Sequence, residues 1–161
     1  MQYYWTLNVI LNMRYGNIRE AEIINHIKDD WFGNFDCTAI IKDIDFSVKL
    51  IRENDAFIFD DEYLLWAEAK KGSEDTHIML AQLILTIGKA RTFDKIMPPK
   101  FLGAFDSEKI VFVPYFEMQD IFYLNDFNWN VAPSNHETRE FQLIKDKIET
   151  VLNGAPQQTF L

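Results

Sequence analysis

The sequence is poor in cysteine and histidine, and this excludes several kinds of site. Cys37 is the single cysteine among 161 residues, so neither a disulfide within the chain nor a cysteine-rich zinc site can form. One cysteine also fits a reducing compartment, and we expect the protein to be cytoplasmic. The histidines His26, His77 and His136 lie far apart and show no metal-ligand spacing such as H-E-x-x-H.

Glycine and proline are also sparse, and long apolar runs are missing. Six glycines and five prolines are scattered along the chain, so no segment has the composition of an interdomain linker. The longest apolar candidate, residues 78–88, is too short for a span of about 20 residues. The first residues lack the basic segment and cleavage site of a signal peptide. We therefore expect one domain over residues 1–161 and no membrane partner.

Basic residues are in the minority. The chain has 16 Lys and Arg against 25 Asp and Glu, a formal net charge of -9. A domain that holds nucleic acid by counterion release is expected to be basic, so the composition argues mildly against DNA binding. Residues 70–100 are a local exception, with three acids (Glu74, Asp75, Asp94) and six bases. Those bases are Lys70, Lys71, Lys89, Arg91, Lys95 and Lys100.

Hydrophobic residues make up 48% of the chain, which is enough for a core. Helical spacing predicts helices, and alternation or short apolar runs predict strands. The expected order is a helix over 18–29, strands at 44–51, 56–59 and 63–67, a buried helix over 75–91, strands at 101–105 and 110–113, and a helix opened by a capping box at 134–137. We expect an α/β fold with a mixed central sheet flanked by helices. The apolar tail 157–161 resembles the start of a further strand, as in a piece of a longer protein.

The candidate catalytic residues are an acid at the start of one predicted strand and a Glu-x-Lys motif at the end of the next. If residues 60–62 form a tight hairpin loop, Phe59 pairs with Tyr63. Asp55 then lies opposite Ala67, one step from Glu68. Because side chains alternate along a strand, Glu68 and Lys70 share a face. The pattern predicts two carboxylates and an amine at one end of a two-stranded ribbon.

This combination of groups fits phosphodiester hydrolysis. Carboxylate oxygens suit Mg²⁺, which lowers the pKa of a bound water and neutralises charge on a phosphate. A neighbouring lysine holds the nucleophile or stabilises the developing charge. The sequence has neither a Walker loop nor a Gly-x-Ser-x-Gly motif.

The series Asp55…Glu68-Ala69-Lys70, followed by a long helix with Gln82, resembles the PD-(D/E)XK nuclease superfamily, with Asn54 in place of its proline. The likeness covers about residues 18–113. Residues 65–71, 82–89 and 99–105 further resemble the N-terminal endonuclease domain of restriction-modification proteins. In those proteins one chain fuses the nuclease to an adenine-N6 DNA methyltransferase.

The resemblance implies a restriction-endonuclease-like fold and Mg²⁺-dependent hydrolysis of DNA, with Mn²⁺ as a substitute metal. Asp55, Glu68 and the Ala69 carbonyl would bind the metal, and Lys70 would position the water. Gln82 and an acid on the first helix, either Glu20 or Glu22, would be auxiliary, and Glu20 is preferred for its helical face. The implied partners are double-stranded DNA, bound weakly by this domain alone, attached methyltransferase and target-recognition domains, and a second copy in a dimer.

Each of these residues also has a structural interpretation. Glu68 and Lys70 could form an ordinary ion pair, and Asp55 could begin a strand with an Asx turn. Glu20 fits a capping box with Asn17, and Gln82 could satisfy a buried carbonyl. Two other functions stay open: an acidic DNA mimic that inhibits DNA-binding enzymes, and a nuclease-fold binding module that does not cleave.

Overall fold

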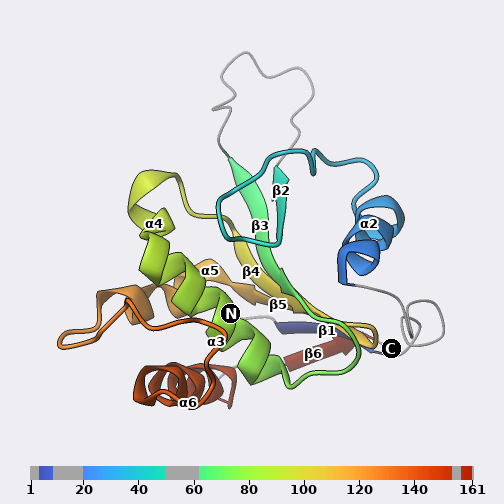
Figure 1. The fold of residues 1–161 in the computed structure, drawn as a ribbon. Coiled ribbons are helices and arrows are strands. Elements are labelled where there is room, and N and C mark those ends of the chain that lie inside the picture. Colours follow the sequence, from blue (N-terminus) through green and yellow to red (C-terminus); the bar gives the residue numbers. More distant parts are fainter. Residues whose placement is uncertain (1–3, 9–19, 50–61, 154–156, 161) are drawn as a thin grey trace.

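The sheet has six strands of mixed direction. The computed structural model describes residues 4–8, 20–49, 62–153 and 157–160 (Figure 1). The strands are β1 (Tyr4–Asn8), β2 (Phe46–Lys49), β3 (Tyr63–Ala69), β4 (Phe101–Phe105), β5 (Lys109–Pro114) and β6 (Gln157–Phe160). They lie in the order β2-β3-β4-β5-β1-β6. The pairs β3–β4 and β1–β6 are parallel and the other three are antiparallel.

Helices cover both faces of this sheet (Figure 1). They are α2 (Glu20–Trp31), α3 (Thr76–Ala90), α4 (Thr92–Lys95), α5 (Tyr115–Met118), the 3-10 helix η1 (Gln119–Tyr123) and α6 (Arg139–Asn153). The helix α3 packs against β3 and β4 and also against α6, and α2 contacts β3 from the other side. The α/β prediction of a mixed central sheet between helices is therefore confirmed.

Alternation along β3 divides the core into two clusters. Trp66 packs toward α3 and α6, in the larger cluster, which we call the α3 face. Leu65, Ala67 and Ala69 pack toward α2, in the smaller cluster, which we call the α2 face. Since side chains alternate along a strand, Glu68 belongs to the α3 face with Trp66.

The helix α3 is nearly all apolar because it is buried on almost every side. Asp75 caps its start by accepting N–H bonds from His77 and Ile78. Arg91, in the left-handed region at φ 52, ends it. A Cβ on Gly88 would stand only 2.1 Å from the Trp129 ring, so glycine lets that indole seat directly on the helix.

The predicted hairpin register is wrong. Tyr63 pairs with Lys49 and Ala67 faces Phe46, while the predicted strand 56–59 lies outside the described residues. The partner of β3 is thus the earlier segment 46–49, whose alternation is also strand-like, and the connection between them is longer than the three acids at 60–62. The last helix also starts later than the capping box 134–137, because Thr138 accepts the Phe141 N–H.

None of the helices in the described ranges combines the length and the apolar character needed to cross a membrane.

Candidate functional site

An acid stands opposite Glu68 across the first strand pair. The β2–β3 register joins Phe46 to Ala67, and continuing it by one residue places Asp45 opposite Glu68. The Asp45 carboxylate accepts a 3.0 Å bond from the Ala69 backbone N–H. Asp45 is otherwise exposed, so the acid pair has access to solvent. The structure therefore brings an Asp to Glu-x-Lys, but the residue is Asp45.

Glu68 is a buried carboxylate, with 3% of its surface exposed. Its Oε1 lies 3.2 Å from the Lys70 Nζ. Desolvation, followed by the negative charge of Asp45, raises the pKa of Glu68 to about 8, and the Lys70 ammonium only partly offsets this. A carboxylate so perturbed beside an amine and a second acid is typical of functional sites.

The first helix contributes a third acid. Glu20 begins α2 on the stripe that buries Ile23 and Ile27, and it is partly buried. Desolvation, then the charge of Asp45, raises the pKa of Glu20, while Lys70 and the Lys71 N–H lower it. Glu20 thus lies within electrostatic range of the acid pair. Glu22 is exposed on the same helix.

A second buried acid holds the loop that follows Lys70. Asp106, which is fully buried, accepts N–H bonds from Glu74, Glu108 and Lys109 and the Lys109 ammonium. Ser107 exchanges two bonds with Gly72, one in each direction. The Lys70 N–H donates to the Phe105 carbonyl at 2.9 Å. We refer to Asp106, Ser107 and Lys109 as the loop clamp, which fixes the backbone that follows Lys70, at Gly72 and Glu74.

The donor set at the acid pair fits a hard divalent cation in part. In the described ranges, no three Asp, Glu, His or Cys side chains gather as a ready metal site. After desolvation, the negative charge of Asp45 is the next cause of the raised pKa of Glu68, and a cation would relieve both this repulsion and the cost of burying the charge. Two carboxylates with a backbone carbonyl and waters are oxygen ligands of the kind Mg²⁺ accepts. Ala69, fully buried beside both acids, is the peptide that could supply the carbonyl.

The other predicted residues lie apart from this acid pair or outside the described residues. Asp55 is among the residues that the structure does not describe. Gln82 is on α3, where its Oε1 lies 3.4 Å from the His136 Nε2, and it lines a separate cavity. Sequence reasoning missed Asp45, treating it as one polar residue of an alternating strand. The available signal was an acid at the start of the strand preceding Glu-x-Lys.

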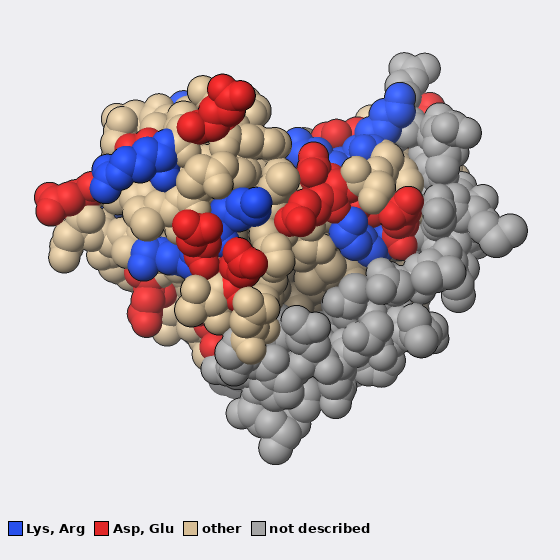
Figure 2. All heavy atoms as spheres, turned by 90° about the horizontal axis from the view of Figure 1, so that it is seen from below, with Lys and Arg blue, Asp and Glu red and all other residues tan. Residues whose placement is uncertain are grey.

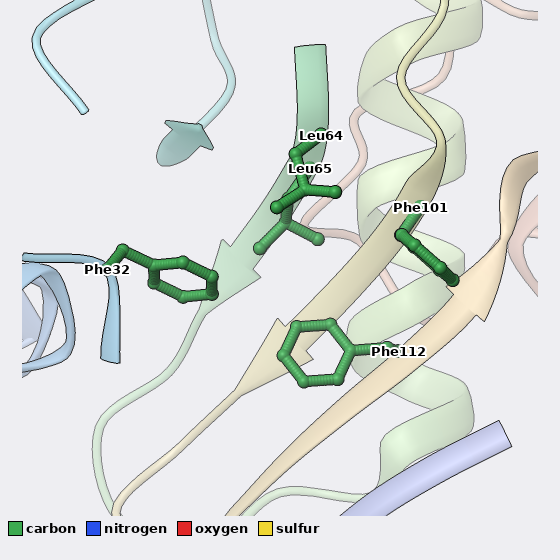
Figure 3. A pocket seen from close by; sticks show the side chains of 5 residues that line it. All are labelled: Phe32, Leu64, Leu65, Phe101 and Phe112. Carbon is green, nitrogen blue, oxygen red and sulfur yellow. The ribbon is translucent and has the colours of Figure 1, made fainter. Parts of the chain in front are cut away.

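A second concavity is apolar. Phe32, Leu64, Leu65, Phe101 and Phe112 line a pocket of about 190 Å³ on the α2 face (Figure 3). Figure 3 shows Phe101 and Phe112 projecting from β4 and β5 and Phe32 approaching from beyond the end of α2. The side chains that line it, among the residues that the structure describes, are all apolar.

Comparisons of the chain with protein-family models, with curated proteins and with solved structures find no match. The likeness to PD-(D/E)XK nucleases therefore stays a prediction, supported by the residues themselves.

Proposed function

We propose that this chain is a Mg²⁺-dependent endodeoxyribonuclease domain of the restriction-modification kind. The observation that carries the proposal is the juxtaposition of Asp45 and Glu68 across β2 and β3, with Lys70 3.2 Å from Glu68. Burying the Glu68 carboxylate beside a second acid is costly to fold, and a purely structural role gives no return for that cost. Mg²⁺, or Mn²⁺ in its place, is the implied cofactor and cytoplasmic DNA the implied substrate.

In this proposal the chain's residues divide the work of hydrolysis. Asp45 and Glu68 would hold the cation with the Ala69 carbonyl, and the bound cation would supply charge stabilisation at the phosphate. Lys70 would orient the attacking water, whose oxygen forms the new bond to phosphorus as the P–O ester bond breaks. The leaving oxygen takes up a proton. Glu20 would tune the charge of the pair.

The charge pattern supports an enzyme over an acidic DNA mimic. A mimic needs carboxylates arrayed on one surface. Figure 2 shows Lys and Arg side chains interspersed among Asp and Glu on the face drawn there. Lys70 also pairs with Glu68 where a mimic would need no base.

A cleavage assay on supercoiled plasmid and genomic DNA tests the proposal, with Mg²⁺, Mn²⁺ or EDTA. We expect cleavage by the wild type in either metal and none in EDTA. Asp45→Asn, Glu68→Gln and Lys70→Met should each slow cleavage at least about a hundredfold. Asp146→Asn, an exposed acid on α6, is the matched control and should cleave as the wild type does.

Four outcomes would contradict the proposal or its residues. Equal cleavage by the Asp45, Glu68 and Lys70 variants would remove this site. A wild type that never cleaves but inhibits another nuclease would be a mimic, and one that binds without cleaving would be a silent module. Asp55→Asn belongs in the same series: loss of cleavage there, with Asp45→Asn active, would return the metal site to Asp55.

A further inference from the structure

A polar cavity of about 620 Å³ lies beside α3, apart from the acid pair. Three lysines line it: Lys42 from the loop before β2, Lys89 near the end of α3, and Lys95 from α4. Gln82, Asn130 and Ser134 also line it and bring hydrogen-bond donors. Four separate segments of the chain thus turn cationic or donor groups toward one space.

The charge of this cavity is opposite to that of the chain. Its lining holds three lysines and one acid, Asp43, so it is net +2 in a chain of net charge -9. Within the described residues, Lys42 and Lys89 form no ion pair. Lys95 donates to the Ala90 carbonyl at 2.7 Å, which ties its ammonium to the rim rather than to an acid. Uncompensated lysines around one hollow favour an anion.

The polar groups favour an anion with several acceptor oxygens. The Gln82 Oε1 lies toward His136, which leaves the amide N–H groups of Gln82 as donors. The Ser134 hydroxyl and the Asn130 amide add further donors. A phosphate presents oxygens in several directions and lysine is a common partner for it, as a point charge on a flexible stem.

The cavity is connected to the acid pair through segments of the chain that they share. Gln82 and Lys89 lie on α3, the helix that covers the face of β3 to which Glu68 belongs. Lys42 precedes Asp45 by three residues on the same loop. The loop that carries Asp45 thus also contributes Lys42 to the cavity, so a nucleic-acid strand that reached the acid pair could follow this loop to the cavity.

We infer that this cavity binds a phosphate group of a nucleic-acid strand, with Lys42 and Lys89 as its principal cationic contacts. The identity of the strand as the substrate rests on the proposed function. The binding itself does not, because phosphate contacts hold the strand whether or not the acid pair cleaves it.

Measuring equilibrium binding in EDTA separates binding of the strand from its cleavage. The probe is a fluorescein-labelled DNA duplex, followed by anisotropy as NaCl is raised, with the wild-type full chain. The double variant Lys42→Glu/Lys89→Glu should bind at least about tenfold more weakly, and its log–log salt slope should be shallower by about 2. Lys147→Glu, which reverses one charge on α6 away from the cavity and is compared with each of the single variants Lys42→Glu and Lys89→Glu, should bind within about twofold of the wild type. Thermal unfolding checks that all variants fold.

A second arm distinguishes a strand from a small phosphate compound. Inorganic phosphate and deoxythymidine monophosphate are added as competitors, and displacement of the duplex only at concentrations far above that of an unlabelled duplex supports the strand. Displacement by either at micromolar concentration would overturn it in favour of a small ligand. Equal binding by the double variant and the wild type, an equal loss in the Lys147 control, or no wild-type binding would each overturn the inference. Loss of cleavage in the Asp45 variant with intact binding would leave both proposals standing.

Discussion

The two faces of the sheet differ in how completely they are covered. On the α3 face, α3 and α6 pack in two layers, and Trp66, Leu83 and Phe141 are fully buried. On the α2 face, one helix buries Ile23 and Ile27 against β2 and β3, and beyond it Phe101 and Phe112 stay partly exposed around the apolar pocket (Figure 3). Stability should therefore reside mainly on the α3 face. The acid pair and Glu20 lie where the two faces meet at the end of β3.

The largest difference between the two faces should be in the stability lost when an aromatic side chain is replaced by alanine. Phe141→Ala removes a ring buried between α6 and α3, and should lower the free energy of unfolding by about 3–5 kcal/mol. Phe112→Ala removes a partly exposed ring at an open pocket, and we expect about 1 kcal/mol, since less area returns to water. Urea unfolding measures both. Equal losses would mean that the α2 face is as well packed as the α3 face.

The acid at the junction of the faces should make stability depend on pH. The folded pKa of Glu68, about 8, lies above its ordinary value of 4.5, so between these pH values the folded chain binds a proton that the unfolded chain has released. The contribution of Glu68 to the free energy of unfolding is therefore fully present below about pH 4.5, and it is lost as pH rises through about 8. Glu68→Gln should match the wild type at pH 4 and exceed it by about 2–4 kcal/mol at pH 9.

The measurement is the unfolding free energy in EDTA across this range, for the wild type and the Gln variant. Asp146→Asn again serves as the control, with a difference that should not change with pH. A difference between wild type and Glu68→Gln that is also flat with pH would mean that Glu68 ionises in the folded chain as it does in water.

Two glycines allow a smaller comparison of the faces. A methyl group on Gly88 would meet the Trp129 ring, which Phe122 and Phe127 hold from either side. A methyl group on Gly103 would meet the end of the flexible Leu65 side chain at 2.8 Å and the Val111 carbonyl oxygen at 3.2 Å. We expect Gly88→Ala to cost about 2–3 kcal/mol and Gly103→Ala about 1 kcal/mol, read from thermal unfolding. The reverse order would show that Trp129 moves more freely than Leu65.

The sequence predicted most elements because their apolar patterns are strong. The helix α3, with apolar residues on nearly every side, and the strands β3, β4 and β5 lie close to their expected positions. The strand β6 also forms where the tail 157–161 indicated one. These segments are long or strongly apolar, so local pattern and tertiary packing agree.

The candidate site was only half predictable, for a reason of register. Glu68 and Lys70 were found, since alternation fixes their shared face whatever their partner strand. Asp45 was not found, because two segments before β3 could pair with it and the acids at 60–62 resembled a tight turn, and Asp55 lies outside the described residues. Choosing Asp45 requires knowing that 46–49 takes the edge of β3, which is a long-range pairing that no local pattern encodes.

The loop clamp should slow the motion of the backbone around Lys70. The Lys70, Gly72 and Glu74 amide hydrogens are all bonded to residues 105–107, and one of their acceptors is a fully buried carboxylate. Surface loops usually exchange their amide hydrogens quickly, but these three should exchange about as slowly as those of β4. Lys70 would then be held in position before anything binds there, and breaking the loop clamp would loosen this loop while the sheet stays folded.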